Sequence, residues 1–170
     1  MSHALGAPHL SGIVTEMTLS QMQGSLKRFR RTPWKFQQTF HTPLGNLRPF
    51  VATIASALEP LRGGCVIIDQ VVFEPEHLIG FLARHSLPAE YGHDWSLTAE
   101  GRHETEAVLE AALGDSVDFL FVPTPKAFVI YADHDEYTTF YANSKSNLNR
   151  VAKALCAKRF EKVPGYERVL

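Results

Sequence analysis

The stretch VDFLFVPTPKAFVIYADHDEYTTFYA, residues 117–142, decides the fold class of this chain. Its apolar runs predict strands at 117–122, 127–132 and 137–142, because β-branched and aromatic residues favour a pleated sheet. Pro123 and Pro125 separate the first two strands, and the polar residues 133–136 form a turn between the last two. The segment therefore predicts an antiparallel three-strand meander.

The hairpin within this meander has two largely apolar faces. A symmetric turn would place on one face the pairs Ala132 with Tyr137, Ile130 with Thr139 and Phe128 with Tyr141, and on the other Val129 with Phe140 and Tyr131 with Thr138. Because both faces are apolar, we expect the hairpin to lie in the middle of the sheet with cover on both sides.

Outward from the meander, helical periodicity with caps and breakers predicts five helices. They cover about residues 19–31, 47–59, 75–84, 98–113 and 144–158. Further strands are expected at 34–40, 65–73 and 166–170, with a polar loop at 86–97 and a loose lead-in at 1–12. The strands cluster in sequence, which favours an α+β fold with a mainly antiparallel sheet and about four to five helices packed on it. A doubly wound parallel sheet is the alternative.

Length and composition are typical of a single globular domain. The chain has 170 residues, of which 45% are hydrophobic and 21% charged. No apolar stretch is long enough to span a bilayer, and the first residues lack the features of a signal peptide. Cys65 and Cys156 lie in apolar surroundings without zinc or redox spacing, which predicts two buried thiols in a reducing compartment. We therefore expect a single domain over residues 1–170, located in the cytoplasm, whose oligomeric state stays open.

The charge is distributed in blocks: residues 59–142 carry four basic and fifteen acidic groups, between two net basic segments. These blocks either neutralise one another within the fold or create a polarised surface. The second reading predicts a non-catalytic, protein-binding or regulatory module with an acidic surface for a basic partner. Its binding residues would be Glu100, Glu104, Glu106 and Glu110 on a helix, with Asp133, Asp135 and Glu136 in the turn.

An acid–base or metal-assisted hydrolase is the first alternative. Its candidate catalytic residues are the turn residues Asp133, His134, Asp135 and Glu136, joined by His93 and His103. A histidine among carboxylates supplies the groups that such chemistry requires. However, the sequence contains no HExxH motif, no Gly-x-Ser-x-Gly motif and no Gly-rich phosphate loop, so we expect neither a metal nor a cofactor.

Nucleic-acid binding through residues 27–36 is the second alternative. The basic residues Lys27, Arg28, Arg30, Arg31 and Lys35 alternate there with Phe29, Trp34 and Phe36. Phosphate contact and base stacking need that combination of side chains. The net charge of −1 argues against it, because nucleic-acid-binding domains are usually strongly basic.

Overall fold

The computed structural model describes residues 14–16, 19–85, 87 and 96–170. The helices are α1 (Leu19–Arg31), α2 (Leu47–Ala57), α3 (Glu76–Arg84), α4 (Arg102–Gly114) and α5 (Lys145–Ala157), and a short 3-10 turn, η1 (Leu44–Asn46), precedes α2. The strands are β1 (Val14–Glu16), β2 (Phe36–His41), β3 (Gly63–Gln70), β4 (Ser96–Glu100), β5 (Asp118–Thr124), β6 (Val129–Ala132), β7 (Tyr137–Ala142) and β8 (Lys162–Val163).

One sheet contains all eight strands, in the order β1-β4-β3-β5-β6-β7-β2-β8. Every strand pair in it is antiparallel. The meander β5-β6-β7 occupies the middle of this sheet, between β3 and β2. The predicted α+β fold and the central hairpin are therefore confirmed, and the alternative of a parallel sheet is wrong.

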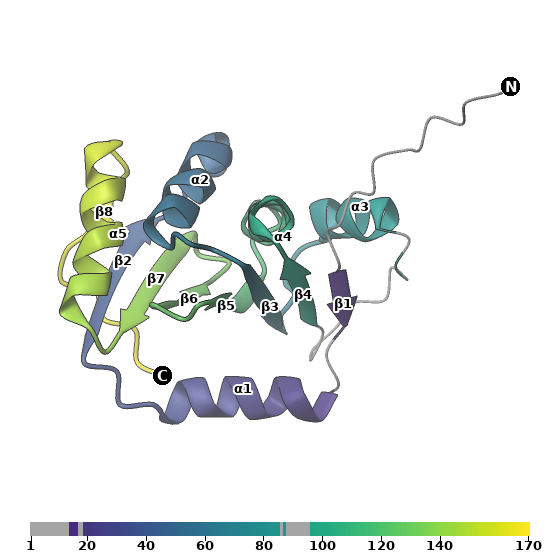
Figure 1. Ribbon diagram of the computed structural model, residues 1–170, viewed down its shortest axis with the longest axis horizontal. Coiled ribbons are helices and arrows are strands. Elements are labelled where there is room, and N and C mark those ends of the chain that lie inside the picture. Colours follow the sequence, from purple (N-terminus) through teal and green to yellow (C-terminus); the bar gives the residue numbers. More distant parts are fainter. Residues whose placement is uncertain (1–13, 17–18, 86, 88–95) are drawn as a thin grey trace, which may run out of the picture.

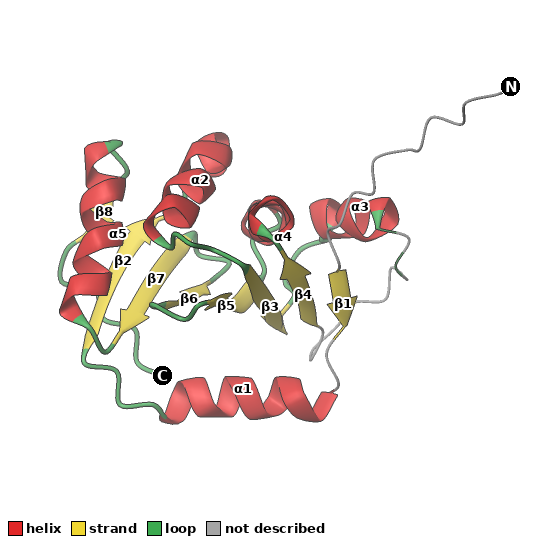
Figure 2. Ribbon diagram, viewed as in Figure 1, coloured by secondary structure: helices red, strands yellow, loops and turns green. Residues whose placement is uncertain are grey.

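Helices cover the two faces of the sheet unequally. Figures 1 and 2 show α2, α3, α4 and α5 on one face and α1 on the other, beside the C-terminal end of the chain. The main core fills the first face with buried rings such as Phe119, Phe121 and Phe140. A smaller aromatic core under α1 includes Phe29 and Tyr131. We call these two sides of the sheet the main face and the α1 face.

The register of the β6-β7 hairpin differs by one residue from the prediction. Ile130 opposes Phe140 and Val129 opposes Tyr141. The turn is asymmetric because Glu136 adopts a positive φ of 65° and the amide of Asp133 donates to the carbonyl oxygen of Tyr137. A slip of one residue exchanges the faces of a strand. Phe140 therefore enters the main core, whereas Tyr141 lies on the α1 face.

Strand β4 lies where the sequence predicted the end of a loop and the start of a helix. Leu97 and Ala99 are buried in the main core, and Thr98 pairs with Cys65 of β3. Helix α4 starts only at Arg102, after Gly101 at a φ of 83°. Thr98 therefore does not begin a helix, because it belongs to a strand that pairs with one edge of β3. Residues 88–95 of the predicted loop lie outside the described residues.

Three smaller predictions are also wrong. Val71, Val72 and Phe73 follow β3 instead of continuing it, and residues 166–170 form no strand. Cys156 is exposed and Cys65 only partly buried. Cys156 lies next to the buried Leu155 on α5, and a step of one residue turns a helix by about 100°, away from the core.

Two glycines at the start of β3 let the neighbouring strands and helix approach closely. A Cβ atom on Gly63 would lie 2.7 Å from the backbone oxygen of Ala99, and one on Gly64 would lie 2.7 Å from the ring of Phe121. Both contacts are shorter than packed atoms permit, so only glycine fits here.

The described helices include none with the length and apolar character needed to cross a membrane. The predicted lead-in at 1–12 lies outside the described residues.

Candidate functional site

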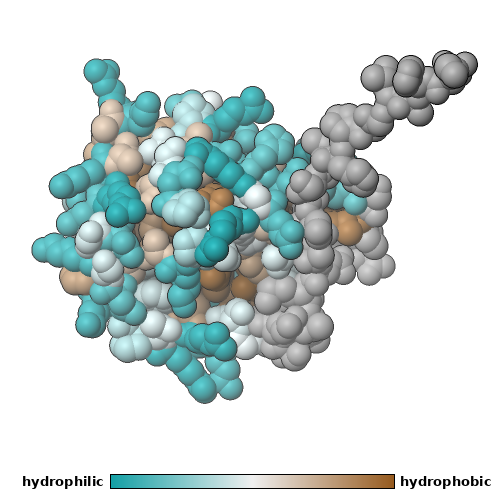
Figure 3. All heavy atoms as spheres, in the orientation of Figure 1, coloured by the Kyte–Doolittle hydropathy of each residue, from teal (hydrophilic) through white to brown (hydrophobic). Residues whose placement is uncertain are grey.

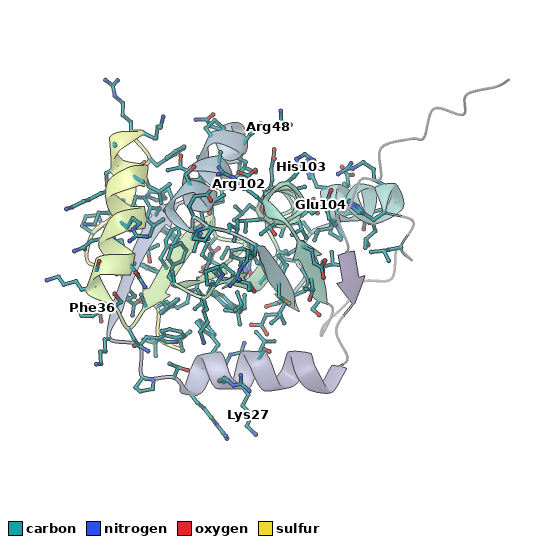
Figure 4. All side chains as sticks on the ribbon, viewed as in Figure 1. Lys27, Phe36, Arg48, Arg102, His103 and Glu104 are labelled. Atoms are coloured by element: carbon teal, nitrogen blue, oxygen red, sulfur yellow. The ribbon has the colours of Figure 1, made fainter. Side chains whose placement is uncertain are left out.

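The predicted acidic residues of α4 have basic neighbours. The ion pairs are Glu104 with His85 at 2.6 Å, Glu106 with Arg102 at 3.5 Å and Glu110 with Arg48 at 4.0 Å. Figure 4 shows Arg48, Arg102 and His103 together above α2 and α4. Glu100 is exposed on β4, before the helix begins. The negative charge of this surface is therefore smaller than the sequence count suggests.

The turn 133–136 divides its carboxylates between two environments. Asp133 is buried, and its Oδ1 accepts hydrogen bonds from the amides of Asp135 and Tyr137 at 3.0 and 3.1 Å. Its other oxygen forms an ion pair with Arg168 of the C-terminal tail. Asp135 and Glu136 are exposed. The first aspartate thus shapes the turn and holds a cation, while the other two acids face solvent.

His134 pairs with an aspartate that the sequence analysis missed. Asp118, at the start of β5, accepts hydrogen bonds from both the amide and Nδ1 of His134 at 2.8 Å. Because this bond favours the protonated ring, it raises the pKa of His134 above its ordinary value. The signal in the sequence is slight, since Asp118 is only a polar residue at the start of a strand.

The other predicted histidines do not join this pair. His103 is exposed at the start of α4, which follows Glu100 of β4. Glu100 opposes Gly63, and Gly63 opposes Thr124 at the far end of β5 from Asp118. A strand of seven residues, about 20 Å long, therefore separates the two histidines. His93 lies outside the described residues.

Metal binding finds no support in the described part of the chain. No group of three or more His, Cys, Asp or Glu side chains there is placed to hold a metal ion. The hydrolase hypothesis, with its candidate residues Asp133, His134, Asp135, Glu136, His93 and His103, stays a prediction.

The raised pKa of His134 has a testable consequence. The stability that this pair contributes is fully present below about pH 6.5, the ordinary pKa of histidine, and is lost as the pH rises through the folded-state pKa. In an NMR titration we expect the His134 ring to change shift with a midpoint above about 6.5. The variant Asp118→Asn should lower that midpoint.

The His103 ring provides an internal control, because it lies at the other end of the sheet. Its NMR signals should be the same in the natural protein and in Asp118→Asn. An unchanged His134 midpoint in Asp118→Asn would show that the aspartate does not control the protonation of this ring.

The basic segment 27–36 is partly engaged inside the fold. Arg30 forms an ion pair with Asp69 of β3, and the hydroxyl of Tyr131 donates to the same carboxylate oxygen at 2.6 Å. The hydrogen bond to Asp69 raises the pKa of Arg30, and burial raises the pKa of Tyr131. Phe29 is buried against Tyr131, with ring centres 5.7 Å apart. These contacts hold α1 on the sheet, and the charge of Arg30 is already paired with Asp69.

The remaining basic side chains of this segment face solvent. They are Lys27, Arg28, Arg31 and Lys35, and within the described residues none of them has a carboxylate within ion-pair distance. Lys27 extends from α1 away from the sheet (Figure 4). The surface in the view of Figure 3 is mainly hydrophilic. The segment thus presents positive charge beside the end of α1.

A cavity of about 470 Å³ lies next to this charge, on the α1 face. Its walls come from the C-terminal half of α1, from β5 and β6, and from the segments that precede β6 and α5. The rings of Phe29 and Trp34 and the side chains of Leu120 and Val129 form much of its apolar lining. The volume lies within the range of small-molecule sites.

The polar groups of the cavity favour an anion. Arg28 and Lys126 line it, are exposed, and have no carboxylate partner among the residues that the structure describes. Ser144, the N-cap of α5, and Asn147 line it as well. The first turn of α5 contains no acidic residue, so the helix dipole adds positive potential there. We call this cavity the α1–α5 pocket.

Comparisons with protein-family models, with curated proteins and with solved structures find no match to this chain.

Sequence reasoning located only part of the α1–α5 pocket. It singled out Arg28, Phe29 and Trp34 as part of a basic and aromatic run, and it placed the start of a helix at about residue 144. Lys126 was missed, because nothing in a single basic residue after Pro125 indicates that it lies near the start of α5. Only the order of the strands brings these segments together.

Proposed function

We propose that this protein binds a small phosphorylated ligand with a planar ring, of the mononucleotide class, in the α1–α5 pocket. One observation supports the proposal most: a cavity with an aromatic lining has two cations, Arg28 and Lys126, beside the N-terminus of a helix, and neither has a carboxylate partner among the described residues. Planar rings pack well on aromatic side chains, and phosphate binds well at helix N-termini and basic side chains. The aromatic lining would thus bind the planar ring, and the two cations and the helix N-terminus would bind the phosphate.

Fluorescence of Trp34 provides the test, because this residue lines the pocket. The variant Trp95→Phe leaves Trp34 as the only tryptophan of the chain. We expect AMP to change its emission in a saturable way, and adenosine or inorganic phosphate alone to bind more weakly. Lys126→Ala and Arg28→Ala should each weaken AMP binding about tenfold or more, since a charged hydrogen bond contributes about 1.5–3 kcal/mol.

Lys158→Ala is the matched control, because it removes the same charge at the other end of α5. It should leave AMP binding unchanged. If none of the three probes binds saturably, or if Lys158→Ala weakens binding as much as Lys126→Ala, the proposal is wrong.

A single-stranded oligonucleotide distinguishes a nucleotide site from a nucleic-acid surface. Binding through residues 27–36 requires that a dT12 strand binds more tightly than AMP. It also requires that Lys27→Ala and Arg31→Ala each weaken the binding of dT12. A pocket for a free nucleotide requires that these two exposed residues have no effect on AMP.

We propose as a second function the binding of a basic segment of a partner protein through the acidic residues of the turn 133–136, in a regulatory role in the cytoplasm. The contact of Asp133 with a guanidinium favours it. Asp135 and Glu136 are exposed, so they can reach a partner. Neither cysteine forms a disulfide, which agrees with a reducing compartment.

Salt and charge removal test this function. A partner captured at low salt should be released at high salt, and the double variant Asp135→Asn, Glu136→Gln should not capture it. If the amount captured is the same after both changes, this function is excluded.

A further inference from the structure

The C-terminal tail, residues 164–170, lies on the α1 face like a bound peptide. It leaves β8 through a turn at Pro164 and Gly165 and then forms no strand. Tyr166 stacks on Tyr137 of β7 with ring centres 4.8 Å apart, and Arg168 lies two residues further. Figure 1 shows the C-terminal end on the same side of the sheet as α1.

The guanidinium of Arg168 occupies a site on the strands. It lies over the ring of Tyr131, 4.7 Å from the ring centre, and forms an ion pair with the buried Asp133. The side chain of Arg168 is only 18% exposed. A planar cation between an aromatic face and a carboxylate is the arrangement by which proteins recognise arginine specifically. We call the site formed by Tyr131, Asp133 and Tyr137 the arginine site.

The arginine site does not depend on the tail for its shape. Two backbone amides of the turn orient the carboxylate of Asp133. Tyr131 is held by Asp69 and by the ring of Phe29. The site is therefore prepared in advance by β6, β7 and their turn.

The tail in turn contributes few contacts of its own. Among the described residues, one hydrogen bond joins the backbone of the tail to the sheet, from the amide of Arg168 to the side-chain Oε1 of Gln37 at 3.0 Å. The Nε atom of Arg168 is buried without a hydrogen-bond acceptor among the described residues. A buried donor without a partner costs about 1–3 kcal/mol, so the tail fits the site imperfectly.

We propose that the arginine site binds an extended segment of a partner protein, with an aromatic residue two positions before an arginine, and that the tail is an internal competitor for it. Residues i and i+2 of an extended segment face the same side, which lets such a segment present both groups at once. This inference rests on the second proposed function and names the chemistry of its partner; it does not rest on the α1–α5 pocket.

A labelled peptide with the tail sequence PGYERVL tests the proposal by fluorescence anisotropy against the full chain. The variant Arg168→Ala empties the site, so it should bind the peptide at least tenfold more tightly than the natural chain does. The same peptide with Arg168→Ala should lose at least tenfold in affinity. Adding Asp133→Asn to the chain should abolish binding.

Two further chains keep the outcome clear if Arg168→Ala folds poorly. Tyr166→Ala removes only the stacking on Tyr137 and should raise peptide affinity by a smaller factor, while Glu167→Ala, at an exposed neighbour, should behave as the natural chain. Lys126→Ala should bind the peptide normally, which separates this result from that of the pocket. The proposal is overturned if the peptide binds all chains equally well, or if the two peptides bind equally well. It is also overturned if the peptide binds neither Arg168→Ala nor Tyr166→Ala.

Discussion

The variant Phe140→Ala is expected to lower the free energy of unfolding by about 3–5 kcal/mol, the usual cost of deleting a fully buried phenylalanine side chain. Phe140 has no exposed surface, and its ring meets those of Phe40 at 5.9 Å and Phe128 at 5.4 Å. These three rings join β2, β7 and the residue just before β6 on the main face. Removing one leaves a cavity between strands that cannot move closer. Urea denaturation measures the loss.

Phe73→Ala is the matched control, since Phe73 follows β3 and is 57% exposed. Its cost should stay within about 0.5 kcal/mol. A loss below about 1.5 kcal/mol for Phe140→Ala would contradict the complete burial of this ring in the main core.

The elements that sequence reasoning located are those defined by neighbouring residues. Helix α1 covers the predicted residues 19–31, because its apolar positions, its basic last turn and Pro33 are all local signals. The meander was equally clear, since β-branched and aromatic runs alternate with prolines and a polar turn. In both cases the deciding interactions lie within a few residues of one another.

The interactions that form the candidate sites join residues far apart in the chain. Arg168 meets Asp133, Arg30 meets Asp69, and Lys126 meets the start of α5. No periodicity links such residues, because their contact depends on strand order and on which helices cover each face. The register error has the same origin: a positive φ at Glu136 was not visible in a turn made only of charged residues.

Such long-range contacts also join the charge blocks of the sequence. Each of the two basic segments forms an ion pair with the acidic middle segment: Arg30 of α1 pairs with Asp69 of β3, and Arg168 of the tail pairs with Asp133 after β6. Exposed pairs of this kind contribute little to stability, whereas buried ones penalise the loss of either partner. The pair of Asp133 and Arg168 belongs to the second kind.

We therefore expect Asp133→Ala to lower the free energy of unfolding at neutral pH by about 3–5 kcal/mol, as removal of one partner from a buried ion pair usually does. The change leaves the largely buried guanidinium of Arg168 without its carboxylate and the amides of Asp135 and Tyr137 without their acceptor. Asp135→Ala, two residues away and exposed, should cost less than about 0.5 kcal/mol.

A double-mutant cycle with Arg168→Ala then separates the two roles of Asp133. If the ion pair dominates, the double variant should be clearly more stable than the two single losses added together, because neither charge remains buried alone. If the turn dominates, the losses of Asp133→Ala and Arg168→Ala should simply add. Equal, small losses for Asp133→Ala and Asp135→Ala would contradict the burial of Asp133 and remove the basis of the arginine site.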